Sequence, residues 1–401
     1  MAKTSSSTVS PKITLFSAVV VHGFVEIPFF IFPAVLILVG EDLFPNAEFS
    51  WLGLGALGTL GTLIAGVPAP FFGSLADKYR RSLLMTISLA LGAAGALVVG
   101  VFGGSFFGLG VGIFLMGLGV SLYHPPGLSW VSSSFENTQK GAQNSYNRIL
   151  AVHSIGGTIG SALGPLSVYL LIDTINWRQI YLLWSIPLAL LAIGFWIFIG
   201  RREAGFNATS NAVFHPKVQQ MIEPPSSPTL RRSYATLLTL FAFIFAMSLV
   251  RGMISFILAP FLTEEKGFEI SQAAFFVGVS TLIGAIGQLA VGALGDKYGE
   301  KAILSSVAAL QAVFLVGIYT VRGEWALLGF YVLLGLSTAM FWPATQSLIA
   351  KNSKQRGKAF GWFILVGNVV GGLGPSIDGI IISIDFNGYS MIFGFAILFA
   401  L

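Results

Sequence analysis

The stretch GSLADKY at residues 73–79 decides the fold, because it returns as GALGDKY at residues 292–298. Each copy lies between two long apolar runs, so each is predicted to be a short charged loop joining two membrane-spanning helices. The copies are 219 residues apart in a chain of 401 residues. A loop that recurs after about half of the chain predicts two halves built as a repeat.

Two further sequence pairs keep nearly the same separation. Tyr-His-Pro at residues 123–125 matches Phe-Trp-Pro at residues 341–343, and Gly-Pro at residues 164–165 returns at residues 374–375. All these segments lie in or beside apolar runs. The repeat therefore predicts six spans, a connection and six more spans, which is the arrangement of transporters that rock two halves about a central site.

The connection between the halves is a polar segment that contains four prolines, Pro216, Pro224, Pro225 and Pro228. Proline-rich polar segments are typical of linkers. We therefore predict an N-terminal six-helix bundle over residues 1–200, a cytoplasmic linker over 201–231 and a C-terminal six-helix bundle over 232–401.

The composition agrees with a membrane protein: 55% of the residues are hydrophobic and 10% are charged, whereas soluble domains carry roughly 25% charged residues. This excludes a soluble enzyme, a nucleic-acid-binding module and a disordered chain. A spanning helix needs about 20 apolar residues. The predicted spans are 13–39, 51–75, 82–101, 104–134, 142–172, 177–200, 232–262, 270–295, 301–320, 324–350, 357–384 and 388–401. The last is short, and we expect a truncated helix there.

The positive charges orient these spans, because cytoplasmic loops are enriched in Lys and Arg. With a cytoplasmic N-terminus, only Arg178, Lys266 and Arg322 fall in outer loops and Arg251 falls within a span, which leaves eighteen Lys and Arg on the inner side. The sequence thus predicts an integral protein of the plasma (inner) membrane with both termini in the cytoplasm.

The two loops at 73–79 and 292–298 resemble the loop signature of the major facilitator superfamily, a family of secondary transporters. The first copy has Arg80 where a glycine is usual, and the second keeps Gly299. The resemblance covers the whole chain. It implies an all-α fold of twelve transmembrane helices in two bundles, and transport by alternating access.

A finer resemblance links the chain to fosmidomycin-resistance-type efflux proteins. It rests on His22, Glu26 and Pro33, on residues 123–125, and on the glycine-rich run at 156–166. Glu26 stands where an aspartate is expected. The run from Gly160 to Pro165 also resembles an antiporter motif, although the residues that follow lack its trailing glycines.

Four charged residues near the two repeated loops are candidates for an inner gate: Asp77, Arg81, Asp296 and Lys297. A carboxylate can stabilise the positive end of a neighbouring helix by about 0.3–1 kcal/mol. A contact made in only one conformation would bias the equilibrium between states, and the resemblance implies such a role. The alternative is that they are solvated loop charges.

Ionisable residues within spans indicate functional sites. His22 and Glu26 are four residues apart and share a helix face. With a rise of 1.5 Å per residue they lie about 15 and 21 Å from the start of their span, and His153 lies about 17 Å into its own. These three are predicted to carry protons if their spans adjoin. The alternative is a static acid–histidine pair.

Arg251 is the one basic residue within a span, and it needs a partner. That partner is either Glu26 or an anionic substrate; alternatively the arginine bonds backbone carbonyls. His124, which precedes two prolines, either lines the cavity or satisfies carbonyls that those prolines free. The remaining predicted substrate-binding residues, which could equally join helices, are Gln288, Trp342, Gln346 and Asn368.

The sequence contains no phosphate-binding loop of the GxxxxGK[ST] type and no His/Asp/Glu cluster with the spacing of a metal site, so we predict no enzyme activity, cofactor or metal. We expect proton-coupled efflux of a small organic molecule by a monomer in the lipid bilayer. The alternatives are a symporter or uniporter for a metabolite or organic anion, and a membrane receptor or scaffold that does not transport.

Overall fold

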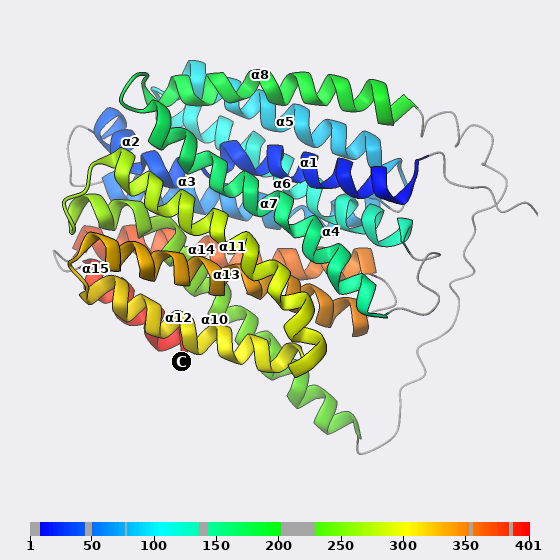
Figure 1. Ribbon diagram of the computed structural model, residues 1–401. Coiled ribbons are helices and arrows are strands. Elements are labelled where there is room, and N and C mark those ends of the chain that lie inside the picture. Colours follow the sequence, from blue (N-terminus) through cyan, green and yellow to red (C-terminus); the bar gives the residue numbers. More distant parts are fainter. Residues whose placement is uncertain are drawn as a thin grey trace, which may run out of the picture.

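The computed structural model describes residues 9–44, 50–76, 78–135, 143–201, 229–352, 356–384 and 388–401. These residues are all helical apart from short connections (Figure 1). The helices of the first part of the chain are α1 (Pro11–Phe29), η1 (Phe32–Val35), α2 (Leu36–Leu43), α3 (Ser50–Gly66), α4 (Ala69–Ala76), α5 (Arg81–Phe102), α6 (Phe106–Ser134), α7 (Gln143–Leu171), α8 (Trp177–Phe195) and η4 (Trp196–Gly200). The second part contains α10 (Thr229–Glu264), α11 (Ile270–Tyr298), α12 (Glu300–Thr320), α13 (Glu324–Asn352), α14 (Arg356–Ile384) and α15 (Gly388–Ala400).

Eleven helical stretches in the described part of the chain are long and apolar enough to cross a membrane. The first, Pro11–Leu43, combines α1, η1 and α2, and the second, Ser50–Ala76, combines α3 and α4. The twelfth apolar helix, α15, has 13 residues. The predicted all-α architecture of twelve membrane helices is therefore confirmed.

Proline explains the two interrupted spans. Pro33 lies in the 3-10 turn η1, and Pro68 lies in the turn between α3 and α4. Proline has no amide hydrogen to donate and its ring clashes with the preceding turn, so helices bend or stop beside it. Both interruptions lie along the central cavity described below or next to it.

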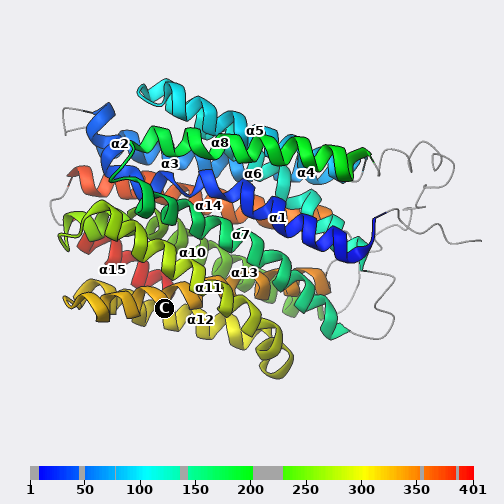
Figure 2. The same cartoon turned by 45° about the horizontal axis from the view of Figure 1, so that its top comes forward.

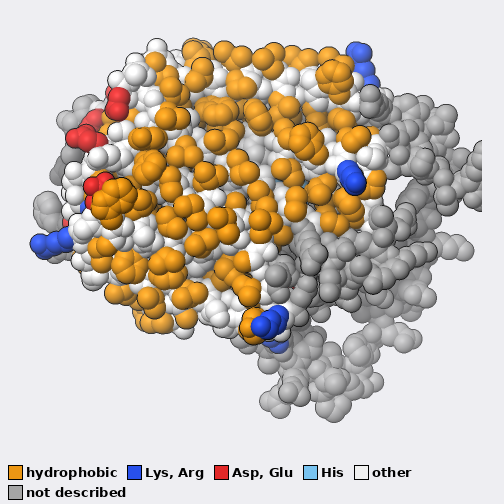
Figure 3. Space-filling model, in the orientation of Figure 1, with side chains coloured by type: hydrophobic (Ala, Val, Ile, Leu, Met, Phe, Trp, Pro, Cys, Tyr) orange, Lys and Arg blue, Asp and Glu red, His pale blue; other side chains and the backbone are white. Residues whose placement is uncertain are grey.

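The outer surface is apolar, as expected for helices that contact lipid. Phe107 and Trp325 are among the large hydrophobic side chains that are more than three-quarters exposed. Figure 3 shows hydrophobic side chains over most of one face, with acidic side chains at one end of the molecule. The face between the ends offers few charges to the bilayer.

Within the first part of the chain, α1 packs along α7 and α6, while α5 packs between α6 and α8. Within the second part, α10 packs along α14, and α13 contacts both α11 and α12. Two further pairs join the parts: α7 lies alongside α11, and α3 lies alongside α14 (Figures 1 and 2). These two pairs form the walls of the space between the parts.

The contact of α1 with α7 requires glycine. A Cβ atom added to Gly160 would collide with the backbone carbonyl of Gly23, and one added to Gly156 would collide with that of Val19. In membranes such small residues let helix backbones approach closely. This close approach brings the polar residues of α1 next to those of α7.

Candidate functional site

A cavity of about 200 Å³ lies between α1, α3, α6 and α7 on one side and α10, α11, α13 and α14 on the other. All nine residues predicted to carry protons or bind substrate line it: His22, Glu26, His124, His153, Arg251, Gln288, Trp342, Gln346 and Asn368. Their functional roles remain predictions. Their convergence on one cavity follows from the packing of eight helices, which no single segment encodes.

Apolar residues bound the cavity toward both ends. At the C-terminal end of α1, its last residue, Phe29, lines the cavity together with Phe30 and Phe32, which follow that helix. Toward the opposite end, a buried cluster packs Ala69 and Leu128 from the first part of the chain against Phe363 from the second. In this conformation the polar centre of the cavity thus lies between two apolar layers.

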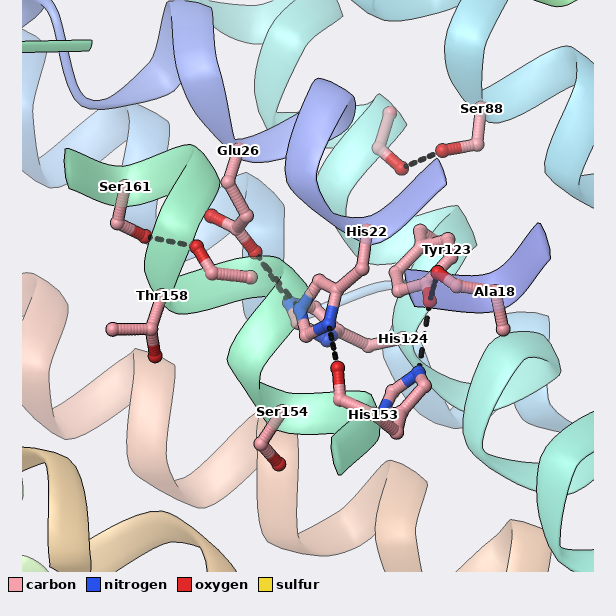
Figure 4. A network of polar contacts seen from close by, with 12 residues as sticks. Ala18, His22, Glu26, Ser88, Tyr123, His124, His153, Ser154, Thr158 and Ser161 are labelled. Atoms are coloured by element: carbon pink, nitrogen blue, oxygen red, sulfur yellow. Dashed lines mark hydrogen bonds and ion pairs between the residues drawn. The ribbon is translucent and has the colours of Figure 1, made fainter. Parts of the chain in front are cut away.

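The centre of the first wall is a carboxylate beside two imidazoles (Figure 4). Oε1 of Glu26 lies 3.1 Å from Nε2 of His124 on α6 and 3.6 Å from Nε2 of His22 on its own helix. Glu26 is only 6% exposed. Burial makes an unpaired charge costly, and a hydrogen on Nε2 of either histidine would compensate the carboxylate.

Backbone carbonyls fix the tautomers of this group. Nδ1 of His22 lies 3.2 Å from the carbonyl oxygen of His153 and must donate its hydrogen, since a carbonyl only accepts. The Tyr123 hydroxyl donates to the carbonyl of Ala18 at 2.6 Å, so it accepts from Nε2 of His153 at 2.8 Å. Neutral His22 therefore presents a lone pair at Nε2 to the carboxylate of Glu26.

This arrangement creates a place for one additional proton. A lone pair of His22 that faces a carboxylate oxygen is unfavourable, and a hydrogen on either atom turns the contact into an attraction. The ring of His22 also stacks on Tyr123 and His153, with centroids 4.8 and 4.9 Å apart. The site can therefore gain or lose a proton while its rings stay packed.

A glycine makes room for the histidine. A Cβ atom at Gly157, on α7, would overlap the imidazole ring of His22. This position belongs to the glycine-rich run that the sequence singled out. The run therefore leaves room for the His22 ring as well as bringing the helices together.

The opposite wall carries the cationic group. Nη2 of Arg251 donates to Oδ1 of Asn368 at 3.3 Å, and the guanidinium carbon lies 5.2 Å from the centre of the Trp342 ring. Nε of Arg251 is buried without a hydrogen-bond partner. Within the described residues, the ion pairs of Glu26 are with histidines and none is with Arg251. The arginine shares the cavity with Glu26 and keeps donor capacity free.

Two polar contacts cross the cavity between α7 and the second part of the chain. Nε2 of Gln288 donates to the hydroxyl of Thr158 at 2.7 Å, and the hydroxyl of Ser154 donates to Oε1 of Gln346 at 3.4 Å. Sequence reasoning missed Ser154, Thr158 and Tyr123. The four-residue spacing of Ser154 and Thr158 places them on one helix face, and Tyr123 stands in the repeated motif.

The predicted gate residues are only partly described. Asp77 and the side chain of Asp296 lie outside the described residues. Nη1 of Arg81 donates to the hydroxyl of Ser133 at 3.0 Å, which links α5 to the end of α6. Lys297 is exposed and its Nζ lies 4.9 Å from the ring centre of Tyr298. The gating role remains a prediction.

The ligand-type atoms of His22, Glu26 and His124 all lie within 4.8 Å of one another, a spacing that a metal ion could bridge. Sequence reasoning predicted no such grouping, because His124 comes from a different span. Its two close nitrogen–oxygen contacts can each also be bridged by a hydrogen.

Comparison with known proteins identifies the family of this chain and finds solved structures with a similar fold. Residues 14–250 and 240–401 match the Major Facilitator Superfamily. The chain belongs to the Major Facilitator Superfamily. It is 26% identical over 332 residues to the multidrug resistance protein MdtG of Salmonella typhimurium, which covers 80% of this chain and 77% of that protein. The same values hold for MdtG of Salmonella typhi.

Solved transporter structures share the fold. A bacterial homologue of the human lysosomal transporter Spinster, in an inward-facing and occupied conformation, has a TM-score of 0.67 at 15% identity and covers 94% of this chain and 83% of that one. The human organic anion transporter MFSD10 has a TM-score of 0.64 at 17% identity, with coverage of 96% and 99%. Membership of this family makes the protein an integral membrane secondary transporter rather than an enzyme.

Proposed function

We propose that this transporter exports a small organic molecule in exchange for protons. The observation that carries the proposal is the buried contact of Glu26 with His22 and His124, in which one hydrogen can be held or released. This site faces the same cavity as Arg251, a cation with unused donor capacity. A proton site and a substrate site in one cavity permit exchange, because occupation of one changes the field at the other.

The bundles at residues 1–200 and 232–401, joined by the linker at 201–231, would rock about this cavity. Contacts of α7 with α11 and of α3 with α14 support such an interface. The Asp77 and Asp296 loops would hold the inner end closed. We place both termini and the linker in the cytoplasm and the protein in the inner membrane, as the charge distribution indicates. One chain forms the whole cavity, which supports a functional monomer.

Export is supported by the relationship to the multidrug resistance protein MdtG. The finer resemblance to fosmidomycin-resistance-type proteins suggests fosmidomycin as the first probe. Arg251 would hold an anionic group of the substrate, since guanidinium binds carboxylate and phosphate oxygens in pairs. Asn368 and Trp342 would orient the guanidinium, while Gln288 and Gln346 line the rest of this wall.

The test uses a bacterial strain that lacks its own efflux pumps. Cells that produce the protein should accumulate less fosmidomycin than cells with an empty vector, and an uncoupler that dissipates the proton gradient should abolish the difference. A matched panel of anionic and cationic growth inhibitors tests substrate charge. Equal accumulation of every compound with and without the protein would contradict export. Export that survives the uncoupler would contradict proton coupling and favour a uniporter.

A further inference from the structure

A second cavity of about 130 Å³ adjoins the main one. It lies mostly among α10, α11, α12 and α13, inside the second part of the chain. Five residues line both cavities: Phe30, Pro33, Ser161, Arg251 and Ser255. Arg251 therefore stands where the two spaces meet.

The wall of this side cavity is apolar in character. Ile254, Leu258 and Leu315 are among its hydrophobic lining residues. Two of its hydroxyl groups donate to the backbone: Ser280 to the carbonyl of Tyr331 at 2.6 Å, and Thr281 to that of Val277 at 2.8 Å. The side chains of Gln311 and Thr338 also line it, so the wall is mainly apolar and carries a few polar groups.

The main cavity, by contrast, contains buried polar atoms that are not used in hydrogen bonds. Nε of Arg251 and Oε1 of Gln288 are buried without hydrogen-bond partners, and Glu26 faces the same space. A polar lobe and an apolar lobe thus lie side by side with a guanidinium between them. Such a pair of surfaces matches a molecule with a polar head and an apolar group.

We propose that the side cavity is the subsite for the apolar group of the substrate, whose anionic or polar part lies at Arg251 in the main cavity. The proposal rests on the transport function proposed above and adds the shape of the substrate. Pockets for whole drug-sized molecules measure roughly 300–1,000 Å³, so the side cavity takes a part of the molecule. Because α10–α13 form most of its wall, the apolar group travels with the C-terminal half as the halves rock.

The test compares benzoate, 4-ethylbenzoate and 4-butylbenzoate as probes of the purified full-length protein. Dissociation constants come from isothermal titration and from ligand-induced shifts in melting temperature. Affinity should rise about fourfold for each added methylene that becomes buried in the side cavity. Thr338→Leu narrows this cavity and should keep benzoate binding while abolishing the gain with chain length. Thr338→Val, which keeps the space, is the matched control and should retain the gain.

Ala259→Leu narrows the same cavity from α10 and replaces Thr338→Leu if that variant does not fold. Benzoate binding without any gain for the longer probes would overturn the side cavity as a subsite and leave the proposed export intact. An equal rise in affinity with chain length in the wild type and in both narrowed variants would also overturn the proposed subsite, since partitioning of the probes into detergent would explain that rise. If none of the probes binds, both the side-cavity subsite and the anion site at Arg251 are overturned. Proton-driven export is tested separately, by the cellular experiment.

Discussion

His124 lies closer to Glu26 than His22 does, although His22 shares a helix face with Glu26. The nitrogen–oxygen distances are 3.1 Å from α6 and 3.6 Å within α1. Both contacts lie within the first part of the chain, one inside α1 and the other between α1 and α6. Under the proposed rocking of the two halves this group moves as one unit, and its protonation would change through its access to solvent and its distance from Arg251 on the other half.

Glu26→Gln should abolish proton-driven accumulation while sparing exchange of substrate down its own gradient. Glutamine keeps the size of the side chain but cannot hold a transferable proton. Counterflow and gradient-driven uptake of labelled fosmidomycin in proteoliposomes, compared from pH 5.5 to 8, separate the two activities. Glu26→Asp, which retains a carboxylate, is the control. Wild-type accumulation by Glu26→Gln at every pH would rule out the coupling role.

Gly157→Ala should destabilise the protein by about 1–3 kcal/mol, the usual cost of overpacking, and should displace the His22 ring. The added methyl group overlaps that ring, which also packs against the rings of Tyr123 and His153. Thermal melting and the pH dependence of transport measure both effects. Gly194→Ala, where an added Cβ atom meets nothing within 4 Å, is the matched control. Equal melting temperatures for the two variants would contradict this packing.

Thr158→Val and Gln288→Leu should show a coupling energy of about 0.6 kcal/mol in a double-mutant cycle, the average for polar contacts between membrane helices. The two side chains form a 2.7 Å hydrogen bond between α7 and α11. Melting temperatures of the wild type, the two single variants and the double variant give the coupling. If the effects of the two single variants add up to that of the double variant, the hydrogen bond does not stabilise the folded conformation whose melting is measured.

Asp378→Leu should raise the stability of the folded protein by about 1–3 kcal/mol, the cost of a buried polar group without a partner. Asp378 is fully buried in α14, and both carboxylate oxygens have no hydrogen-bond partner. Leucine has a similar size and no polar atoms. Thermal melting at neutral pH measures the change, with Asp378→Asn as the variant that keeps polar atoms. A fall in melting temperature for the leucine variant would show that the carboxyl group makes a stabilising contact.

Single cysteines should report the orientation without interference, because the chain contains no native cysteine. A cysteine at Ser210 in the linker should react with a membrane-impermeant maleimide only in inside-out vesicles. One at Gly267, in the loop between α10 and α11, should react only in intact spheroplasts. The expected pattern follows from the excess of Lys and Arg in the inner loops. Reversed labelling would overturn the orientation and, with it, the assignment of the inner gate.

Much of the fold follows from local sequence. Long apolar runs determine where helices lie, because a bilayer requires every backbone polar group to bond within its own helix. Repeated loops separated by 219 residues predict two halves. The position of His22 one turn before Glu26 placed both on one face. Each of these inferences needs only the chain near the residue concerned, or its comparison with the matching stretch in the other half.

The tertiary structure decided which of the polar residues meet. Nothing in the sequence placed His124 against Glu26, because the two are 98 residues apart and their approach depends on the packing of α1 against α6. Arg251 has Asn368 and Trp342 beside it rather than Glu26 for the same reason. The side cavity, too, exists only where α10 to α13 leave a space together. Hydropathy and helical period act along one segment, whereas distances between side chains on different helices are set by how whole helices fit against one another.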